Sequence, residues 1–421
     1  MLEFTNVRGK ILFNTIIQFV NRFAISGSAF IVNLIIAFYF GARGYGEYAK
    51  ATTFIALFYL FTDFGLNAVT LRDMTHDPKH QKGIVNNLFG LRTIASVILI
   101  IIALVIVYFL PYNETANEGF TPVAKLAIAS LTILILYQAF LNTTNLIFQK
   151  NLRYEQSTIA NIIASLTTVL AVYLLVIKGF SLPVVLLGYG VGGIVGAIVL
   201  YYFTKRLDPS FAFTFDKNKS INLIKRAFPL GLTLIFNLVY FRADVFVLTL
   251  TRTTTEVGTY GLAYKFFEFP LTFPTFFANA IYPILLIRSK DKKVFIKTSV
   301  KAGAFLFVMS IITMIGLYIF APFLRYIRAD FIPSIEILQL LSISTPIFFI
   351  SSLFMWIMIT YGKNKMLMII YFIGMVFNII LCILYIPTYG TTGAAIITLI
   401  SEALVLILSS IYSIKLLRSK F

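Results

Sequence analysis

Charged residues are scarce in this chain. Asp, Glu, Lys and Arg make up 12% of its 421 residues, whereas hydrophobic residues make up 59%. A soluble domain carries about 25% charged residues, and no compact fold of this length could hide so much apolar surface from water. This composition excludes a soluble globular protein and indicates a chain that crosses a membrane several times.

Cysteine and histidine are scarcer still. The single cysteine, Cys382, lies in an apolar stretch, which excludes a disulfide framework and a thiolate metal cluster. The two histidines, His76 and His80, are spaced like metal ligands on one helix face, but Pro78 lies between them and no further ligand cluster is evident. We therefore interpret this segment as a solvated loop and predict no metal site.

Basic residues outnumber acidic residues by 35 to 17, and they are unevenly distributed between the apolar stretches. The gaps after even-numbered stretches, together with the two termini, hold 25 of them, Arg92 included, and the other gaps hold six. Because basic loops stay in the cytoplasm, both termini are predicted to be cytoplasmic. Membrane topology thus accounts for the net charge of +18, and we predict no nucleic-acid partner.

Twelve stretches are long and apolar enough to span the hydrocarbon core, which takes about 20 residues. The most polar interruption separates the first six from the last six, so we predict an all-α polytopic membrane protein with twelve transmembrane helices in two parallel six-helix lobes. The lobes are residues 1–204 and 227–421, joined by a cytoplasmic linker at 205–226. The predicted spans are 12–40, 48–71, 85–110, 123–148, 159–177, 182–203, 227–250, 257–287, 302–320, 335–359, 366–386 and 394–417.

A short motif supports a duplication. The spacing Gly-x-Tyr-small-x-Ala occurs at 46–51 and again at 258–263, where it opens the second span of each predicted half. A glycine-tyrosine turn before a helix arises readily by chance. Its equivalent place in both halves favours parallel repeats related by an axis along the membrane normal.

Four basic residues remain once those of the gaps and termini are counted, and they lie within apolar spans: Arg22, Lys50, Arg242 and Lys265. A charge at the bilayer centre costs about 2.5–3.5 kcal/mol on insertion scales, so such residues normally face a bundle interior or a water-filled cavity. For Lys50, near the outer end of its span, extension of the side chain to the interface is the alternative.

Polar residues also recur at helical spacing in three spans. Interhelical hydrogen bonds and ion pairs are the alternative to substrate contacts here. Lys265 and Glu268 can pair along their own helix, whereas Arg242 and Asp244 cannot, because two residues turn the helix by about 200°. The three sets are Asn14, Gln18, Arg22 and Ser26; Gln138, Asn142, Asn145 and Gln149; and Lys265, Glu268, Thr272 and Asn279.

Several sequence strings resemble a known family when they are taken together with the twelve spans. They are GEYA at 46–49, DFGL at 63–66, FRAD at 241–244 and IPTYGTTGAA at 386–395, followed by Glu402. The chain resembles the Wzx-type polysaccharide repeat-unit flippases of the multidrug, oligosaccharidyl-lipid and polysaccharide exporter superfamily. The resemblance covers essentially the whole chain.

The resemblance implies export of undecaprenyl-diphosphate-linked O-antigen or capsule repeat units across the bacterial cytoplasmic (inner) membrane by alternating access. It implies lipid-linked oligosaccharide, membrane lipids, a glycan polymerase and a chain-length regulator as partners, and no cofactor other than a coupling H+ or Na+. The implied substrate-binding cations are Arg22, Lys50, Arg242 and Lys265. The implied candidates for ion coupling are Asp63, Asp244, Glu268 and Glu402.

Two alternatives remain open. A cation-coupled drug exporter of the same superfamily would favour an acidic cavity, and the four intramembrane cations argue against it. A membrane-embedded glycan polymerase or glycosyltransferase would need catalytic groups in sizeable external loops. The longest external gap, residues 111–122, holds two glutamates and no histidine. We therefore predict a transporter and not an enzyme.

Overall fold

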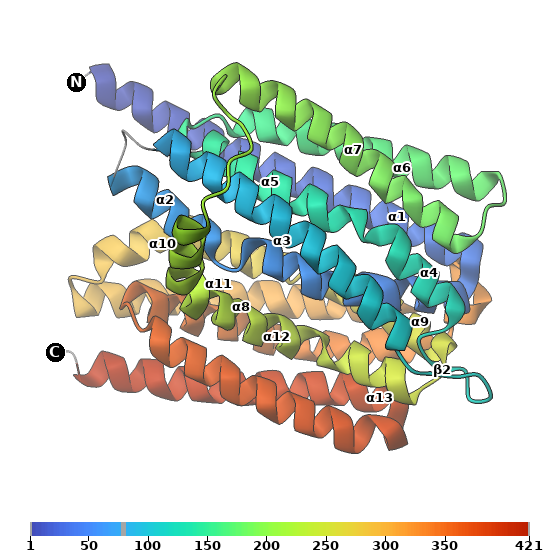
Figure 1. Ribbon diagram of the computed structural model, residues 1–421. Helices are drawn as coiled ribbons and strands as arrows, with labels where there is room; N and C mark the ends of the chain where they lie inside the picture. The colour runs from blue at the N-terminus through green and yellow to red at the C-terminus, as the bar shows by residue number, and fades with distance from the viewer. Residues whose placement is uncertain (1, 77–80, 420–421) are drawn as a thin grey trace. The chain divides into compact units, whose positions relative to one another are not determined.

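The computed structural model describes residues 2–76 and 81–419, and helices make up nearly all of this part of the chain (Figure 1). Two strands of two residues each, β1 (Tyr112–Asn113) and β2 (Glu118–Gly119), follow the third helix and pair with each other. The α-helices are α1 (Leu2–Asp63), α2 (Leu66–His76), α3 (Gln81–Phe109), α4 (Pro122–Leu131), α5 (Ile133–Lys150), α6 (Tyr154–Ile177), α7 (Leu182–Leu207), α8 (Lys217–Thr251), α9 (Thr254–Glu268), α10 (Thr272–Arg288), α11 (Lys292–Phe320), α12 (Pro333–Thr360) and α13 (Asn364–Ser419). Two short 3-10 helices, η1 (Ala321–Tyr326) and η2 (Ala329–Phe331), precede α12.

Ten helical segments of the described chain are long and apolar enough to cross a membrane. Two of these segments have 55 residues each. At 1.5 Å per residue, 55 residues would extend about 80 Å, well over twice the hydrocarbon thickness of about 30 Å. A glycine with non-helical angles interrupts each of the two long helices, Gly41 (φ 64°, ψ −171°) in α1 and Gly390 (φ 58°, ψ −139°) in α13. The protein is therefore a multi-pass, helical membrane protein.

Several helix ends are fixed by capping residues in the sequence. The Thr253 hydroxyl accepts a hydrogen bond from the Glu256 amide, and the Glu256 carboxylate accepts one from the Thr253 amide, which forms a capping box at the start of α9. At the start of α11, the Asp291 carboxylate accepts a hydrogen bond from the Val294 amide, which is a simple N-cap. The first cap matters to the site below because α9 carries Lys265 and Glu268.

The first compact unit comprises residues 1–39, 50–112 and 120–235. Its α6 and α7 approach closely along a glycine face of α7. A Cβ atom at Gly196 would lie 2.7 Å from the Cβ of Ala164, and one at Gly192 would overlap with the Thr168 hydroxyl. Small residues of this kind let membrane helices pack backbone to backbone.

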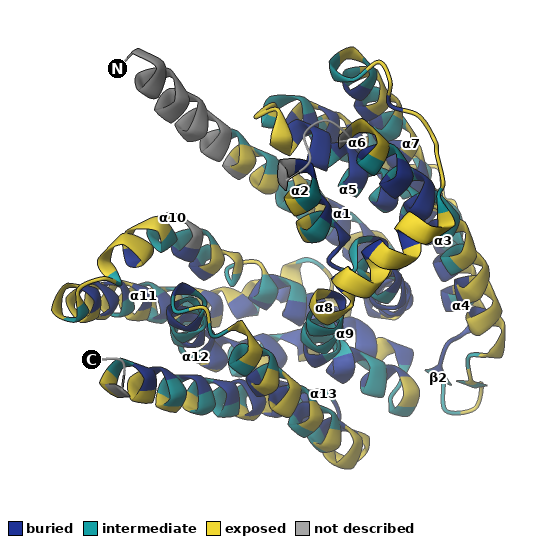
Figure 2. Cartoon of the chain, turned by 60° about the vertical axis from the view of Figure 1, so that its left-hand side comes forward, coloured by how far each residue is buried: buried dark blue, intermediate teal, exposed yellow. Residues whose placement is uncertain are grey.

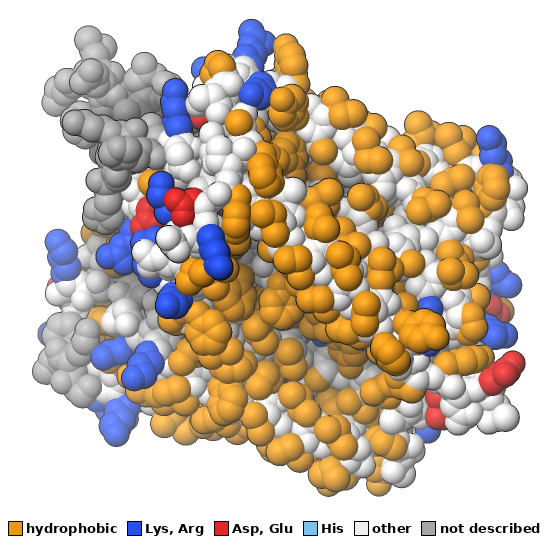
Figure 3. Space-filling model, viewed as in Figure 1, with side chains coloured by type: hydrophobic (Ala, Val, Ile, Leu, Met, Phe, Trp, Pro, Cys, Tyr) orange, Lys and Arg blue, Asp and Glu red, His pale blue; other side chains and the backbone are white. Residues whose placement is uncertain are grey.

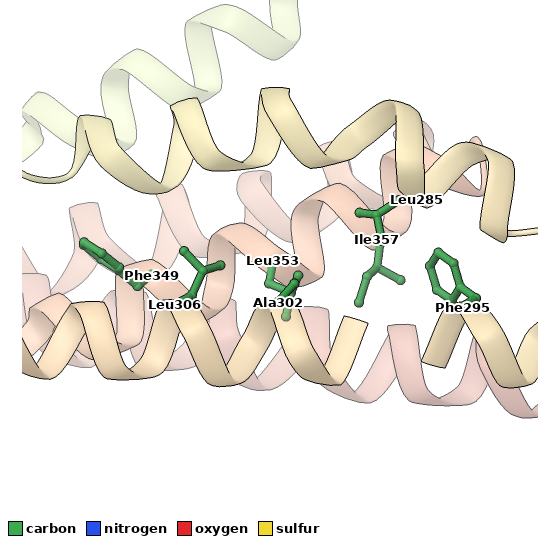
Figure 4. Close-up of a cluster of buried hydrophobic side chains, with 7 residues drawn as sticks. All are labelled: Leu285, Phe295, Ala302, Leu306, Phe349, Leu353 and Ile357. Atoms are coloured by element: carbon green, nitrogen blue, oxygen red, sulfur yellow. The ribbon is translucent and has the colours of Figure 1, made fainter. Parts of the chain in front are cut away.

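The second compact unit comprises residues 40–49, 113–119 and 236–421. One of its hydrophobic clusters joins α10, α11 and α12, with its seven side chains directed between the three helices (Figure 4). Phe295 and Phe349 are fully buried within it. The cluster consists of Leu285, Phe295, Ala302, Leu306, Phe349, Leu353 and Ile357.

The two copies of the duplicated motif pack against each other inside this second unit. A Cβ atom at Gly46 would overlap with the carbonyl oxygen of Thr254, and one at Gly258 would overlap with that of Ala42. A Cβ at Gly261 would lie 3.1 Å from the Cβ of Ala49. The small residues of the motif therefore permit a close helix crossing.

The outward helix faces remain apolar. On α3, Ile101, Val105 and Phe109 are exposed, and hydrophobic side chains cover the visible flanks of α3 and α7 (Figure 3). Along α13 exposed positions alternate with buried ones (Figure 2). Apolar surfaces this large are unfavourable in water, so these helix faces lie against lipid.

Candidate functional site

The second unit holds a cluster of one carboxylate and two cations. Glu268, near the end of α9, accepts a hydrogen bond from Arg242 Nη2 of α8 at 3.0 Å and one from Lys265 Nζ at 2.8 Å. Lys265 and Glu268 lie one turn apart on α9, as their spacing predicts, and Arg242 reaches Glu268 from the neighbouring helix. The side chains are 17% exposed for Arg242 and 34% for Lys265.

This cluster carries excess positive charge. Two cations share one carboxylate, so with all three groups ionised its charge is +1. The guanidinium carbon of Arg242 also lies 5.9 Å from the centre of the Tyr264 ring. The Nε of Arg242 is buried and has no hydrogen-bond partner among the described residues. An arrangement with unused donors and net positive charge inside a membrane protein attracts an anion.

Asp244 makes no direct ion pair with this cluster, as expected for a residue two positions from Arg242. Its carboxylate accepts hydrogen bonds from the Tyr260 hydroxyl and, at 2.7 Å, from the Val245 amide. The residue is 4% exposed. No Lys or Arg in the described chain lies within ion-pair distance of it.

Glu402 of α13 is held in a similar way. Its carboxylate accepts hydrogen bonds from the hydroxyls of Tyr240, at 2.7 Å, and of Ser351. It is 2% exposed, and within residues 2–76 and 81–419 it has no ion-pair partner. Asp244 and Glu402 are thus buried carboxylates held by hydroxyl groups, in contrast with Glu268.

A cavity of about 310 Å³ lies beside these residues and is formed by the second unit alone. Its lining combines aromatic rings, carboxylates, small polar side chains and a few aliphatic residues. It is lined by Asn237, Phe241, Tyr264, Glu268, Leu271, Thr272, Pro274, Thr275, Phe348, Ser351, Ser352, Met355, Tyr371 and Glu402.

Asp63, the remaining acidic candidate, is paired in the first unit. Arg92 donates to Asp63 Oδ1 at 2.9 Å, to the Thr62 carbonyl at 2.9 Å and to the Thr143 hydroxyl at 3.3 Å. Arg92 is assigned above to a cytoplasmic gap although it falls within the predicted span 85–110, and the structure shows that it lies inside α3 and is 1% exposed. Its position close to a basic loop is the reason for this assignment.

The other two predicted cations also belong to the first unit. Arg22 is exposed on α1. Lys50 is 1% exposed, so its ammonium does not extend to solvent as the alternative supposed. The structure thus brings Arg242 and Lys265 together, and it describes Arg22 and Lys50 in the other unit.

The polar set on α5 makes hydrogen bonds within the first unit. Gln138 Nε2 donates to Asn142 Oδ1 at 3.2 Å, and Asn142 Nδ2 donates to the Thr62 hydroxyl at 3.3 Å. The first bond lies within α5, and the second joins α5 to α1, which agrees with the interhelical alternative for Asn142. The side chains of Asn14, His76 and Asn279, and all of His80, lie outside the described residues. In the part that is described, no group of three or more His, Cys, Asp or Glu side chains could hold a metal.

Comparison with known proteins identifies the family. The model of the family described as polysaccharide biosynthesis protein matches residues 11–289. The chain belongs to this family. A relative from Shigella dysenteriae, named as a candidate O-antigen transporter, is 23% identical over 369 residues, which are 86% of this chain and 90% of the relative.

The fold of this polysaccharide biosynthesis protein is shared with solved transporters. It resembles the lipid II flippase MurJ in an inward closed conformation, with a TM-score of 0.77 and 17% identity over 96% of this chain and 87% of that one. It also resembles an inward-facing multidrug resistance transporter of the MATE family and MOP superfamily, with a TM-score of 0.76 and 13% identity over 96% and 98% of the two chains. The chain therefore belongs to the polysaccharide biosynthesis family and has the fold of these solved transporters.

Proposed function

We propose that this protein moves undecaprenyl-diphosphate-linked oligosaccharide repeat units across the bacterial cytoplasmic membrane. The observation that supports this most is the Arg242–Glu268–Lys265 cluster, whose charge is positive inside a membrane-spanning unit. A diphosphate must leave water to cross the hydrocarbon region, and cations in a low-dielectric setting stabilise it there.

The transport path in this proposal uses twelve crossings in two six-helix lobes with cytoplasmic termini. The long helices α1 and α13 each supply two crossings, separated at Gly41 and Gly390. Alternating access of the lobes then exposes the substrate site first to the cytoplasm and afterwards to the outer side. No chemical bond changes, so the protein acts as a transporter.

In this proposal, the diphosphate headgroup replaces Glu268 as the hydrogen-bond partner of Arg242 and Lys265. Glu268 holds Arg242 and Lys265 in place in the absence of substrate. A diphosphate brings more negative charge than one carboxylate and competes for the same donors. Arg22, exposed in the first unit, is a further proposed contact, whereas Lys50 would need a rearrangement to reach a ligand.

Transport energy is proposed to come from a coupling H+ or Na+. Among the four acidic candidates, Asp63 and Glu268 already have cationic partners. Asp244 and Glu402 are held by hydroxyl groups instead. A buried carboxylate without a cation is costly in its charged form, so protonation or a bound cation would stabilise it. We therefore place ion coupling at Asp244 and Glu402.

The proposal is tested in cells in which this protein is the only flippase for the glycan. Replacing both cations, Arg242→Ala with Lys265→Ala, is expected to stop surface glycan and to leave lipid-linked repeat units on the cytoplasmic side. Arg226→Ala is the matched control, because Arg226 forms an ion pair with Asp73 at a half-exposed position. Normal surface glycan from the double variant would contradict the proposal.

A further inference from the structure

The cavity beside the ion cluster has a composition that suits a carbohydrate ring. We propose that it is a saccharide subsite, which holds the first sugar attached to the diphosphate of the lipid carrier. This inference rests on the proposed function and adds the part of the substrate that the cavity recognises.

The walls of the cavity combine the two features that a sugar ring needs. Phe241, Tyr264 and Phe348 provide aromatic surface, against which the C–H face of a pyranose packs. Glu268 and Glu402 provide carboxylate oxygens, which accept hydrogen bonds from hydroxyl groups. An alkyl chain would offer these carboxylate oxygens no additional hydrogen-bond donor.

Two polar side chains of the cavity have unused hydrogen-bonding capacity. Within the described residues, no hydrogen bond joins the Asn237 amide or the Thr275 hydroxyl to another group. Neither group is paired by the fold, and both belong to helices that carry the ion cluster or adjoin it, α8 and α10. An amide and a hydroxyl in such a position donate to and accept from a polyhydroxylated neutral ligand.

Charge and size define which part of the substrate fits. Glu268 lines the cavity and also binds Arg242 and Lys265, so a ring in the cavity lies next to the groups proposed to bind the diphosphate. At about 310 Å³, the cavity is at the lower end of the range of about 300–1,000 Å³ typical of small-ligand sites. It can therefore accept the first sugar but not the whole repeat unit with its lipid.

The test measures binding by the purified full chain in lipid nanodiscs. The probes are undecaprenyl diphosphate and its conjugates with N-acetylglucosamine, N-acetylgalactosamine and galactose. We expect at least one conjugate to bind tighter than the bare diphosphate. In Asn237→Leu and Thr275→Val, this preference should fall by about three- to tenfold each, while affinity for the bare diphosphate stays unchanged.

The control variant is Thr233→Val on the same helix as Asn237. Thr233 does not line the cavity, and its hydroxyl is bonded to the Pro229 carbonyl of its own helix. Equal binding of all probes by the native chain would overturn the subsite and leave the proposed function standing. Loss of the bare diphosphate along with the conjugates in both cavity variants would also overturn the subsite. Failure of every probe to bind the native chain would overturn the proposed function itself.

Discussion

The two units each contain a carboxylate paired with arginine inside the membrane-spanning region, and the pairs differ in charge. In the first unit one Asp63 balances one Arg92, and each of the three guanidinium nitrogens of the arginine donates to one oxygen acceptor. In the second unit one Glu268 faces both Arg242 and Lys265. A pair that is balanced in charge stabilises the fold, whereas an unbalanced cluster has charge left for a ligand.

Breaking the balanced pair is expected to have the largest effect on stability. Arg92→Ala removes the donors that satisfy Asp63, Thr62 and Thr143, and removal of one partner of a buried pair costs about 3–5 kcal/mol. Since Asp63 is 34% exposed, we expect the lower end of this range. Thermal unfolding of the purified variant measures this loss of stability.

Arg92→Leu combined with Asp63→Leu should recover part of the lost stability, because it removes both charges together. If the single and double variants unfold at the temperature of the native protein, the pair has no structural role.

Replacing the carboxylate of each group by an amide separates the two groups, because it should lower stability in the first unit and raise ligand affinity in the second. Asp63→Asn leaves Arg92 buried without its carboxylate and is expected to destabilise the fold by about 2–3 kcal/mol. Glu268→Gln raises the charge of its cluster from +1 to +2, so it should increase affinity for undecaprenyl diphosphate severalfold. Thermal unfolding and binding are measured on both variants. Weaker binding by Glu268→Gln in a well-folded protein would show that the carboxylate does not compete with the ligand.

The smallest effect is expected at the half-exposed pair of the first unit. Arg226 donates two hydrogen bonds of 2.7 Å to the two carboxylate oxygens of Asp73. Because the side chains are 46% and 23% exposed, Arg226→Ala should cost no more than about 1 kcal/mol and leave transport unchanged. Unfolding and surface glycan are measured together. A loss of transport here would mean that arginine pairs in this protein are functional regardless of burial.

The sequence predicts the features that depend on composition and local spacing. Apolar run length gives a helical, multi-pass membrane protein, and the i,i+3 spacing gives the Lys265–Glu268 pair, which the structure confirms. The division into lobes at residues 205–226 and the roles of the site residues stay predictions.

Contacts between distant segments could not be predicted in the same way. Arg242 meets Glu268 on another helix, and Glu402 is bonded to Tyr240 and Ser351, which are 162 and 51 residues away along the chain. The periodicity of a single helix contains no information on which neighbour it meets. Arg92 was missed for a related reason, because its burial depends on how α3 packs and not on the loop that precedes it.

The most direct test of the charged cluster is the affinity of the purified full chain for undecaprenyl diphosphate, with the uncharged alcohol undecaprenol as reference. For Arg242→Gln combined with Lys265→Gln, we predict a loss of diphosphate affinity of about a hundredfold, from two charge-assisted hydrogen bonds, with no change for undecaprenol. Equal diphosphate affinity of the native chain and a correctly folded double variant would contradict the account.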